Sequence, residues 1–196
     1  MGGMDRRSAL RTLLPALGLV LLPRRLGAEE DIAVPVPLQT DLLLKVAAYD
    51  RNLPARARGV VRIVVLVKRD HARSKLVAEQ ALRALTDKTV AGLPTELALH
   101  TFSDGPGLAE RVQSGKVSIL YLAPGFGSRE LLTIARSLAG QNVLSAGAVA
   151  DFAQTAVSVG FDLVSGKPKL LVNLRRAREQ GVDLSSQLLK LAKVLE

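Results

Sequence analysis

The stretch GVVRIVVLVKRD, residues 59–70, limits the possible folds of this chain more than any other segment. It holds six β-branched residues in a short apolar run, with Gly59 on one side and a charged cluster on the other. Such a run predicts a β-strand, because β-branched side chains pack well on a pleated surface. Both faces of the strand are apolar, so it needs cover on both sides. That is typical of a central strand in a parallel sheet with helices above and below it.

Helical and strand-like segments alternate around this strand. The apolar spacing predicts helices at residues 41–48, 71–85, 107–113 and 128–139, and strands at residues 95–102, 116–123 and 142–147. Thr40 or Asp41 is placed to cap the first of these helices, and Ser128 to cap the last. Strands that alternate with helices of this length indicate βαβ units and a largely parallel sheet.

The last third of the chain has a different pattern. Residues 157–163 alternate between apolar and small or polar side chains, Ser165 and Gly166 follow as a turn, and residues 170–174 alternate again. This pattern predicts a β-hairpin. Leucines at 184, 188, 191 and 195 then form one stripe, which predicts an amphipathic helix over residues 183–195. We therefore expect an α/β fold: a single three-layer domain with a mostly parallel central sheet, a C-terminal β-hairpin and a closing amphipathic helix.

The N-terminal residues have the layout of an export signal. A basic start is followed by an apolar run from Leu13 to Leu22, which is short for a membrane span, and by a small-residue exit at Gly27 and Ala28. Arg6-Arg7 resembles a twin-arginine motif, and the general secretory route and a retained anchor are the alternatives. We expect residues 1–28 to be an export signal cleaved near Ala28, residues 29–38 an extended lead-in containing Pro35 and Pro37, and residues 39–196 the folded domain.

Charge and cysteine content exclude several classes of function. Removal of residues 1–28, with five Arg and one Asp, lowers the formal net charge from +9 to +5. Nucleic-acid binding usually needs a concentrated basic face with aromatic stacking partners, whereas here the charge is dispersed and aromatics make up 3% of the chain. We expect no nucleic-acid partner. The absence of Cys removes thiol nucleophiles, thiolate metal ligands and disulfides together, so an aliphatic core must hold the exported domain.

No motif in the chain carries recognisable chemistry. The two His, His71 and His100, lack a second ligand at His-x-x-x-His or Glu-x-x-His spacing, so we expect no metal site. The loop at residues 124–129 follows a strand and opens a helix, but it matches no phosphate-binding pattern, and its Ser128 is placed to cap the helix. The carboxylates show no paired spacing that suits acid/base work. The sequence therefore predicts no catalytic residue and no cofactor, and we expect a protein that is not an enzyme.

The C-terminal segment VNLRRAREQGVDLSSQLLKLAKVL, residues 172–195, resembles the closing signature of the YfiR-like (HmsC-like) family of periplasmic regulatory proteins. Upstream, LLLKVAAYDRNLP, VVRIVVLV, LTDKTVAGLPTEL and SVGFDLVSGKPKLLVNL are similar to further segments of that family, so the resemblance covers nearly all of the mature chain. The chain departs from the family where Leu53 replaces a Trp before Pro54, and where Gly147-Ala148 replaces a Ser-Asp. The signature positions are Asn173, Leu174, Ala177, Gly181, Ser185, Ser186, Leu188, Leu189, Leu191, Ala192 and Val194.

The resemblance implies a non-catalytic α/β protein of the periplasm that forms a homodimer. It also implies that the protein binds the periplasmic part of an inner-membrane signalling protein, a diguanylate cyclase or sensor kinase, and represses it. The hairpin and tail carry a basic cluster that suits an acidic partner. We predict the partner-binding residues there: Lys169, Asn173, Arg175, Ser185 and Gln187.

An alternative from a different class is a periplasmic small-molecule binding protein. In open α/β sheets, ligands bind in the crevice beyond the carboxyl ends of the strands. A third class, an extracytoplasmic hydrolase, has no residue pattern in its favour. For the small-molecule alternative, the predicted ligand-binding residues are Lys68, Asp104, Gly125, Gly127 and Ser128.

Overall fold

Strand β1 (Val61–Lys68) has a strand on each side and helices above and below it, as its two apolar faces require. The fold is that of a computed structural model, which describes residues 32–195. Five residues of β1, from Ile63 to Val67, are at most 2% exposed. The predicted export signal, residues 1–28, lies outside the described residues.

One sheet runs through the molecule, with its strands in the order β2-β3-β1-β4-β5-β6-β7-β8. The five strands from β3 to β6 in this order are parallel to one another. Three pairings complete the sheet: β2 is antiparallel to β3, β7 is antiparallel to β6, and β8 is parallel to β7. The bounds of the strands are β2 Thr89–Val90, β3 Leu93–Phe102, β4 Ile119–Leu122, β5 Leu144–Gly147, β6 Val159–Val164, β7 Lys167–Asn173 and β8 Lys193–Leu195.

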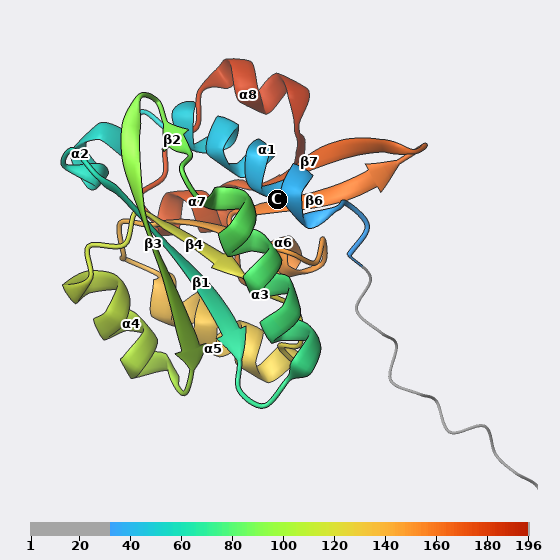
Figure 1. The fold of residues 1–196 in the computed structure, drawn as a ribbon. Helices are drawn as coiled ribbons and strands as arrows, with labels where there is room; N and C mark the ends of the chain where they lie inside the picture. Colours follow the sequence, from blue (N-terminus) through green and yellow to red (C-terminus); the bar gives the residue numbers. More distant parts are fainter. Residues whose placement is uncertain (1–31, 196) are drawn as a thin grey trace, which may run out of the picture.

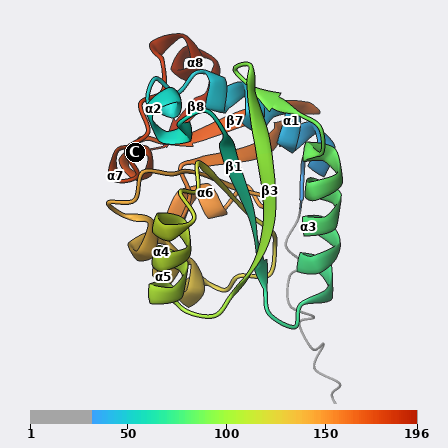
Figure 2. The same ribbon diagram turned by 60° about the vertical axis from the view of Figure 1, so that its left-hand side comes forward.

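Helices cover both faces of the sheet and give three layers. Figure 2 shows α3 on one side of β1 and β3, and α4 and α5 on the other. Helices α1, α3 and α8 pack on the first face, and α4, α5 and α6 on the second. The predicted α/β fold with a mostly parallel sheet is therefore confirmed. The bounds are α1 Val36–Ala48, α2 Leu53–Ala57, α3 Ala72–Leu85, α4 Gly105–Ser114, α5 Ser128–Leu138, α6 Phe152–Thr155, α7 Leu174–Glu179 and α8 Ser186–Leu191.

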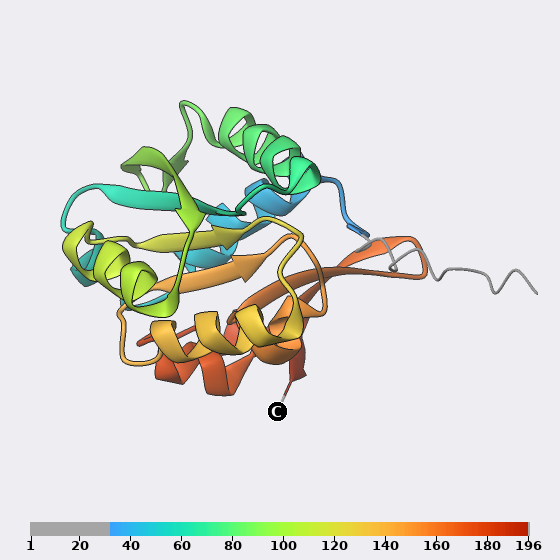
Figure 3. The same cartoon turned by 90° about the horizontal axis from the view of Figure 1, so that it is seen from below.

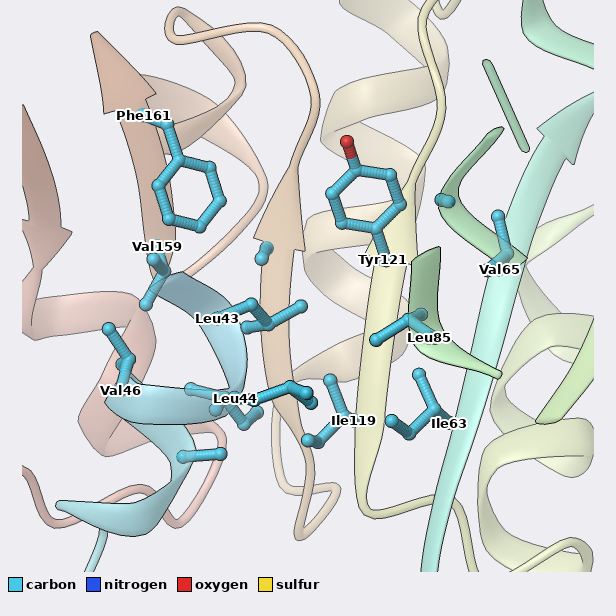
Figure 4. Close-up of a cluster of buried hydrophobic side chains, with 14 of the residues drawn as sticks. Leu43, Leu44, Val46, Ile63, Val65, Leu85, Ile119, Tyr121, Val159 and Phe161 are labelled. Carbon is cyan, nitrogen blue, oxygen red and sulfur yellow. The ribbon is translucent and has the colours of Figure 1, made fainter. Parts of the chain in front are cut away.

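Each face of the sheet has its own hydrophobic core. On the first face, Leu43 of α1 packs with Tyr121 and Phe161, which the sheet projects toward it (Figure 4). On the second face, Phe126 makes edge-on ring contacts with two other phenylalanines, Phe102 and Phe152, at centroid distances of 5.7 and 6.4 Å. Such edge-on pairs are favourable beyond their buried area. All the aromatics of the chain except the exposed Tyr49 thus lie in the two cores.

A buried glutamine joins the first helix to the sheet. The side-chain Nε2 of Gln39 donates to the carbonyl oxygens of Val34 and Ala148, at 2.8 and 3.0 Å. The hydroxyl of Tyr121 donates to Gln39 Oε1 at 2.7 Å, and burial raises the pKa of Tyr121, which keeps this donor protonated. Every polar group of the Gln39 side chain therefore has a partner, which removes the cost of burying it.

The structure corrects three helix starts. Helix α1 begins at Val36, so the segment predicted as an extended lead-in up to residue 38 enters the helix, with Pro37 in its first turn, where a missing N–H costs nothing. Helix α4 begins at Gly105, because Asp104 caps it, so the predicted turn at residues 102–107 supplies the first turn of a helix. Helix α5 is capped at Gly127 rather than Ser128.

The structure also corrects the closing helix. Helix α8 ends at Leu191, and Lys193–Leu195 form β8, which adds to the outer edge of β7. The leucine spacing fits an amphipathic helix. At the edge of β7, however, the backbone groups of residues 193–195 form hydrogen bonds that the last turn of a helix would leave unmade. The hairpin is confirmed, as β6 and β7 pair from Val159 with Val172 to Val164 with Lys167.

Candidate functional site

The β6–β7 hairpin projects from the body of the molecule as a two-stranded arm (Figures 1 and 3). Its turn residues, Ser165 and Gly166, both have positive φ, at 51° and 73°. This sign pattern is that of a type I′ turn, whose twist matches that of the flanking strands. Local backbone geometry therefore favours a tight connection between the two strands of the arm.

The arm is buried at its base and exposed at its tip. Val159 and Phe161 are at most 1% exposed, whereas Leu163 and Val164 are 39% and 50% exposed. Lys167, opposite Val164 in the pairing, is also exposed. Two apolar side chains and a cation thus lie on a segment whose other end is anchored in the first core.

The tail of the chain meets the arm at Lys169. Its Nζ donates to the carbonyl oxygen of Leu191 at 3.0 Å, a favourable place for a cation because carbonyl groups at a helix C-terminus carry partial negative charge. Leu191 is itself 70% exposed. We define the hairpin–tail surface as Leu163, Val164, Lys167, Lys169 and Leu191.

The five predicted partner-binding residues have different roles in the structure. Asn173 is buried: its Oδ1 accepts from the backbone N–H of Arg176, and its Nδ2 donates to the carbonyl of Ala153. Ser185 caps α8, with its Oγ accepting from a backbone N–H. Arg175 and Gln187 are exposed, and within residues 32–195 no hydrogen bond or ion pair involves their side chains. The structure thus joins Lys169 to the tail, gives Asn173 and Ser185 capping roles, and leaves Arg175 and Gln187 free for contact.

The residues predicted for a small ligand lie in loops at the carboxyl ends of the parallel strands, where most of them make contacts within the chain. Lys68 forms an ion pair with Glu130, whose other carboxylate oxygen accepts the backbone N–H of Gly127 at 2.9 Å. Asp104 accepts the backbone N–H of Gly107 at 2.7 Å. Gly125 and Ser128 belong to the same loop and to the first turn of α5. A ligand at this place would compete with these contacts.

The two histidines differ in their surroundings. Nδ1 of His71 accepts the backbone N–H of Ser74 at 3.1 Å and so caps α3. Gly125 packs against its ring, with φ at +107° and ring carbons 2.9 Å from where a Cβ would lie. His100 lies on β3, where burial and, after it, the charge of Arg111 lower the pKa of the imidazole. Its Nε2 is buried with no hydrogen-bond partner in the described part of the chain.

A buried ion pair holds the tail in place, and sequence reasoning missed it. Arg56 Nη1 lies 2.7 Å from Asp50 Oδ2, and both side chains are at most 2% exposed. The other oxygen of Asp50 accepts the backbone N–H of Asp183, and Arg56 Nη2 donates to the carbonyl of Gly181. No sequence signal could have identified these contacts, because the ion pair and the tail are about 130 residues apart.

Two further features of the described residues bear on function. No three His, Asp or Glu side chains among residues 32–195 converge so that they could hold a metal ion. In the same range, no helix combines the length and the apolar character that a membrane span requires.

Comparison with solved structures shows the same fold elsewhere. A chain described as the ABC domain in complex with L-Trp from Streptococcus pneumonia is 15% identical, with a TM-score of 0.51 over 77% of this chain and 62% of that one. A conserved domain protein from Vibrio cholerae is 12% identical, with a TM-score of 0.56 over 83% of this chain and 60% of that one. At such identities the likeness concerns the fold alone. The chain spans about three fifths of the length of each of these proteins.

Sequence comparison identifies the family. Among curated proteins, none matches this chain. The family model described as YfiR/HmsC-like matches residues 38–193, which include every helix except the first two residues of α1 and nearly all of the sheet. The chain therefore belongs to the YfiR/HmsC-like family.

Proposed function

We propose that this protein is a non-catalytic periplasmic regulator that binds the periplasmic part of an inner-membrane signalling protein and holds it inactive. Membership of the YfiR/HmsC-like family supports periplasmic regulation of cyclic-di-GMP signalling in general terms. The observation that carries the proposal is the projecting hairpin, with Leu163 and Val164 exposed at its tip. A diguanylate cyclase is the partner we favour, and a sensor kinase is the alternative within this class.

The hairpin–tail surface suits a partner with an apolar patch and acidic surroundings. Full burial of a Leu or Val side chain contributes about 1.5–3 kcal/mol, so Leu163 and Val164, each already partly buried, would contribute roughly 1 kcal/mol apiece on docking. Lys167 and Lys169 lie on the same face of the hairpin as Val164, with Leu163 on the opposite face. They add electrostatic attraction for carboxylates, which raises the association rate more than the affinity. Apolar contact with flanking charge therefore gives a reversible interaction.

Reversibility is what a repressor of this kind needs. A signal that changes the docking free energy by about 1–3 kcal/mol shifts the affinity roughly 5–150-fold. That range is enough to release the partner without unfolding either protein. The proposal includes export of the mature chain by way of residues 1–28 and formation of a homodimer.

The test is capture of the partner by the mature protein. Tagged residues 29–196 are incubated with detergent-solubilised inner membranes of the source organism, cross-linked, and the captured proteins are identified by mass spectrometry. We expect recovery of a membrane signalling protein with a periplasmic domain, and at least about tenfold lower recovery with Leu163→Asp/Val164→Asp. Arg175→Glu and Gln187→Ala test the two exposed residues predicted on α7 and α8.

Leu132→Asp is the matched control. Leu132 lies on α5, on the far side of the sheet from the first core, and is 44% exposed, so it has an exposure like that of Leu163. Recovery of the same protein in equal amounts with the wild type, the hairpin variant and the control would refute docking through the hairpin. Recovery of no signalling protein with any of them would refute the proposed class of partner.

The small-molecule alternative stays a prediction. At the carboxyl ends of the strands its residues Lys68, Asp104 and Gly127 already have partners within the chain. A thermal-shift screen against periplasmic metabolites tests it: a ligand that stabilises the wild type, but not Lys68→Ala, would support this site over docking.

A further inference from the structure

A cleft of about 360 Å³ opens at the amino ends of β1, β4 and β5. The connections that lead into these three strands line it, and they come from α2, α4 and α5. Figure 1 shows α2 and the C-terminal end of α4 on the side of the molecule away from the hairpin. The cleft therefore lies at the opposite end of the sheet from the hairpin tip and from the ligand crevice that the sequence predicts.

The lining of the cleft is cationic. It contains three basic residues, Arg56, Arg58 and Lys116, and no acidic residue. Arg56 is already neutralised by Asp50. Arg58 and Lys116 are exposed, and within residues 32–195 neither side chain has a hydrogen-bond or ion-pair partner. Two cations thus border one concave site with no counter-charge from its lining.

The backbone at these two cations is unusual for long side chains. Arg58 has φ at 50° and Lys116 has φ at 47°, one at the end of α2 and one just beyond α4. The left-handed region disfavours residues with a Cβ, and helix ends of this kind usually carry Gly or Asn. Each of the two positions has a glycine as its neighbour in sequence, Gly59 and Gly115. Six non-Gly residues within residues 32–195 have positive φ, and the two cations among them border this one cleft.

The floor of the cleft is preorganised. Nε of Arg56 donates to Oδ1 of Asn142 at 2.9 Å, and Arg56 is itself fixed by Asp50 and by the carbonyl of Gly181. This bond uses the acceptor of the Asn142 amide, so its Nδ2 is left as a donor. The amides of Gln113 and Gln141 also line the cleft. Donors that are already positioned cost less to engage with a ligand.

We infer that this cleft binds a small organic anion through its carboxylate or phosphate oxygens. Arg58 and Lys116 contact the anionic oxygens, and the side-chain amides of Gln113, Gln141 and Asn142 contact the remaining polar groups. The volume lies at the lower end of the range for small-molecule sites, about 300–1,000 Å³, so it suits a metabolite rather than a peptide. The inference goes beyond the proposed docking function and does not depend on it.

The test is isothermal titration calorimetry on the purified mature protein at low ionic strength, because salt screens exposed charges. The carboxylate probes are succinate and citrate, and the phosphate probes are inorganic phosphate and glycerol 3-phosphate. We expect at least one probe to bind with a dissociation constant below about 1 mM, and the class that binds tells carboxylate from phosphate recognition. We expect Arg58→Gly/Lys116→Gly to weaken that binding about tenfold or more, because both charged donors are lost.

Substitution by glycine separates loss of the ligand from loss of the fold. Glycine stabilises the folded state because it tolerates the positive φ at both positions, but it also raises the conformational entropy of the unfolded chain. Because these two effects on stability oppose each other, the melting temperature should stay within a few degrees of wild type. Asp87→Gly is the matched control, since Asp87 also has positive φ, at 58°, and does not line the cleft. Binding of no probe to the wild type, or equal binding by the double variant, would overturn the inference.

Discussion

Asp50 and Arg56 form an ion pair 2.7 Å long whose side chains are almost fully removed from water. Two charges are tolerated there because every remaining polar atom near them has a partner, including backbone groups of Asp183 and Gly181 in the tail. The pair therefore acts as a clamp that fixes the start of the tail relative to α2. The ion pair serves to position the tail rather than to add stability, because a buried pair contributes little net stability compared with apolar residues of the same size.

Removal of one partner should be costly. We expect Arg56→Ala to lower the free energy of unfolding by about 3–5 kcal/mol, because Asp50 stays buried without a counter-charge. Arg51→Ala is the matched control: Arg51 pairs with Asp183 at 3.5 Å with both side chains at least 50% exposed, and such surface pairs contribute about 0–1 kcal/mol. Urea denaturation followed by circular dichroism measures both. Equal losses in the two variants would contradict the clamp.

His100 should make the fold sensitive to acid. Burial, and secondarily the charge of Arg111, lower the pKa of its imidazole from 6.5, so the unfolded chain takes up the proton first as the pH falls. The stabilisation from neutral His100 is therefore present above about pH 6.5 and is lost as the pH falls toward the lower folded-state pKa.

We expect the free energy of unfolding of the wild type to fall more than that of His100→Gln between about pH 7.5 and pH 5. Urea titrations at several pH values measure the difference between the two proteins, so contributions from the carboxylates cancel. Parallel curves for the two proteins would show that His100 does not titrate differently in the folded state.

At the scale of elements, the hairpin depends on close packing at its base. Gly160 of β6 lies against α6, where an added Cβ would be 2.8 Å from the Cβ of Ala153 and 3.1 Å from the carbonyl oxygen of Ala150. Backbone cannot move aside as a flexible side chain can. The glycine thus allows α6 and the arm to approach each other.

We expect Gly160→Ala to lower the free energy of unfolding by about 1–3 kcal/mol through overpacking. Gly127→Ala is the control, because a Cβ there meets only a side-chain oxygen of Glu130 at 3.8 Å and its φ is negative. That change brings no overpacking, only the cost of Ala at a helix N-cap. Thermal unfolding monitored by circular dichroism compares them. A Gly160→Ala protein as stable as the control would show that the base of the hairpin is looser than described.

The sequence predicted the elements whose pattern is long and local. The strand at residues 61–68, the helix at residues 72–85 and the hairpin follow from apolar periodicity and from a Ser-Gly turn. The short pieces β2 and α6 could not be predicted, since two and four residues carry no period. Nor could β8: the leucine stripe at residues 184–195 is helical in sequence, and only the unpaired edge of β7 makes Lys193–Leu195 a strand.

Site residues were harder to predict because their roles also depend on contacts that no local sequence pattern shows. A capping residue and a contact residue look alike in sequence, so Asn173 and Ser185 were grouped with Arg175 and Gln187, although only the latter two are exposed and unpaired within residues 32–195. The exposure of Leu163 and Val164 was missed, because alternation shows which side chains share a face but not where the body of the protein stops covering that face. The cleft bordered by Arg58 and Lys116 is assembled from three separate connections, which no local pattern links.

At the scale of the whole molecule, the parallel sheet separates two kinds of surface. The tip of the hairpin lies at the carboxyl end of β6, and the cationic cleft lies at the amino ends of β1, β4 and β5. A regulator with its docking surface at one end of the sheet leaves the other end accessible while the partner is bound. We propose that docking of the hairpin, at the first of these ends, represses a cyclic-di-GMP-producing partner.

The measurement that tests this claim most directly is intracellular cyclic-di-GMP in a strain that lacks the protein, complemented with the wild type, Leu163→Asp/Val164→Asp or Leu132→Asp at equal periplasmic levels. We predict that deletion raises cyclic-di-GMP severalfold, that the wild type and Leu132→Asp restore the low level, and that the hairpin variant does not. Unchanged cyclic-di-GMP on deletion, or full restoration by the hairpin variant, would contradict repression through the hairpin.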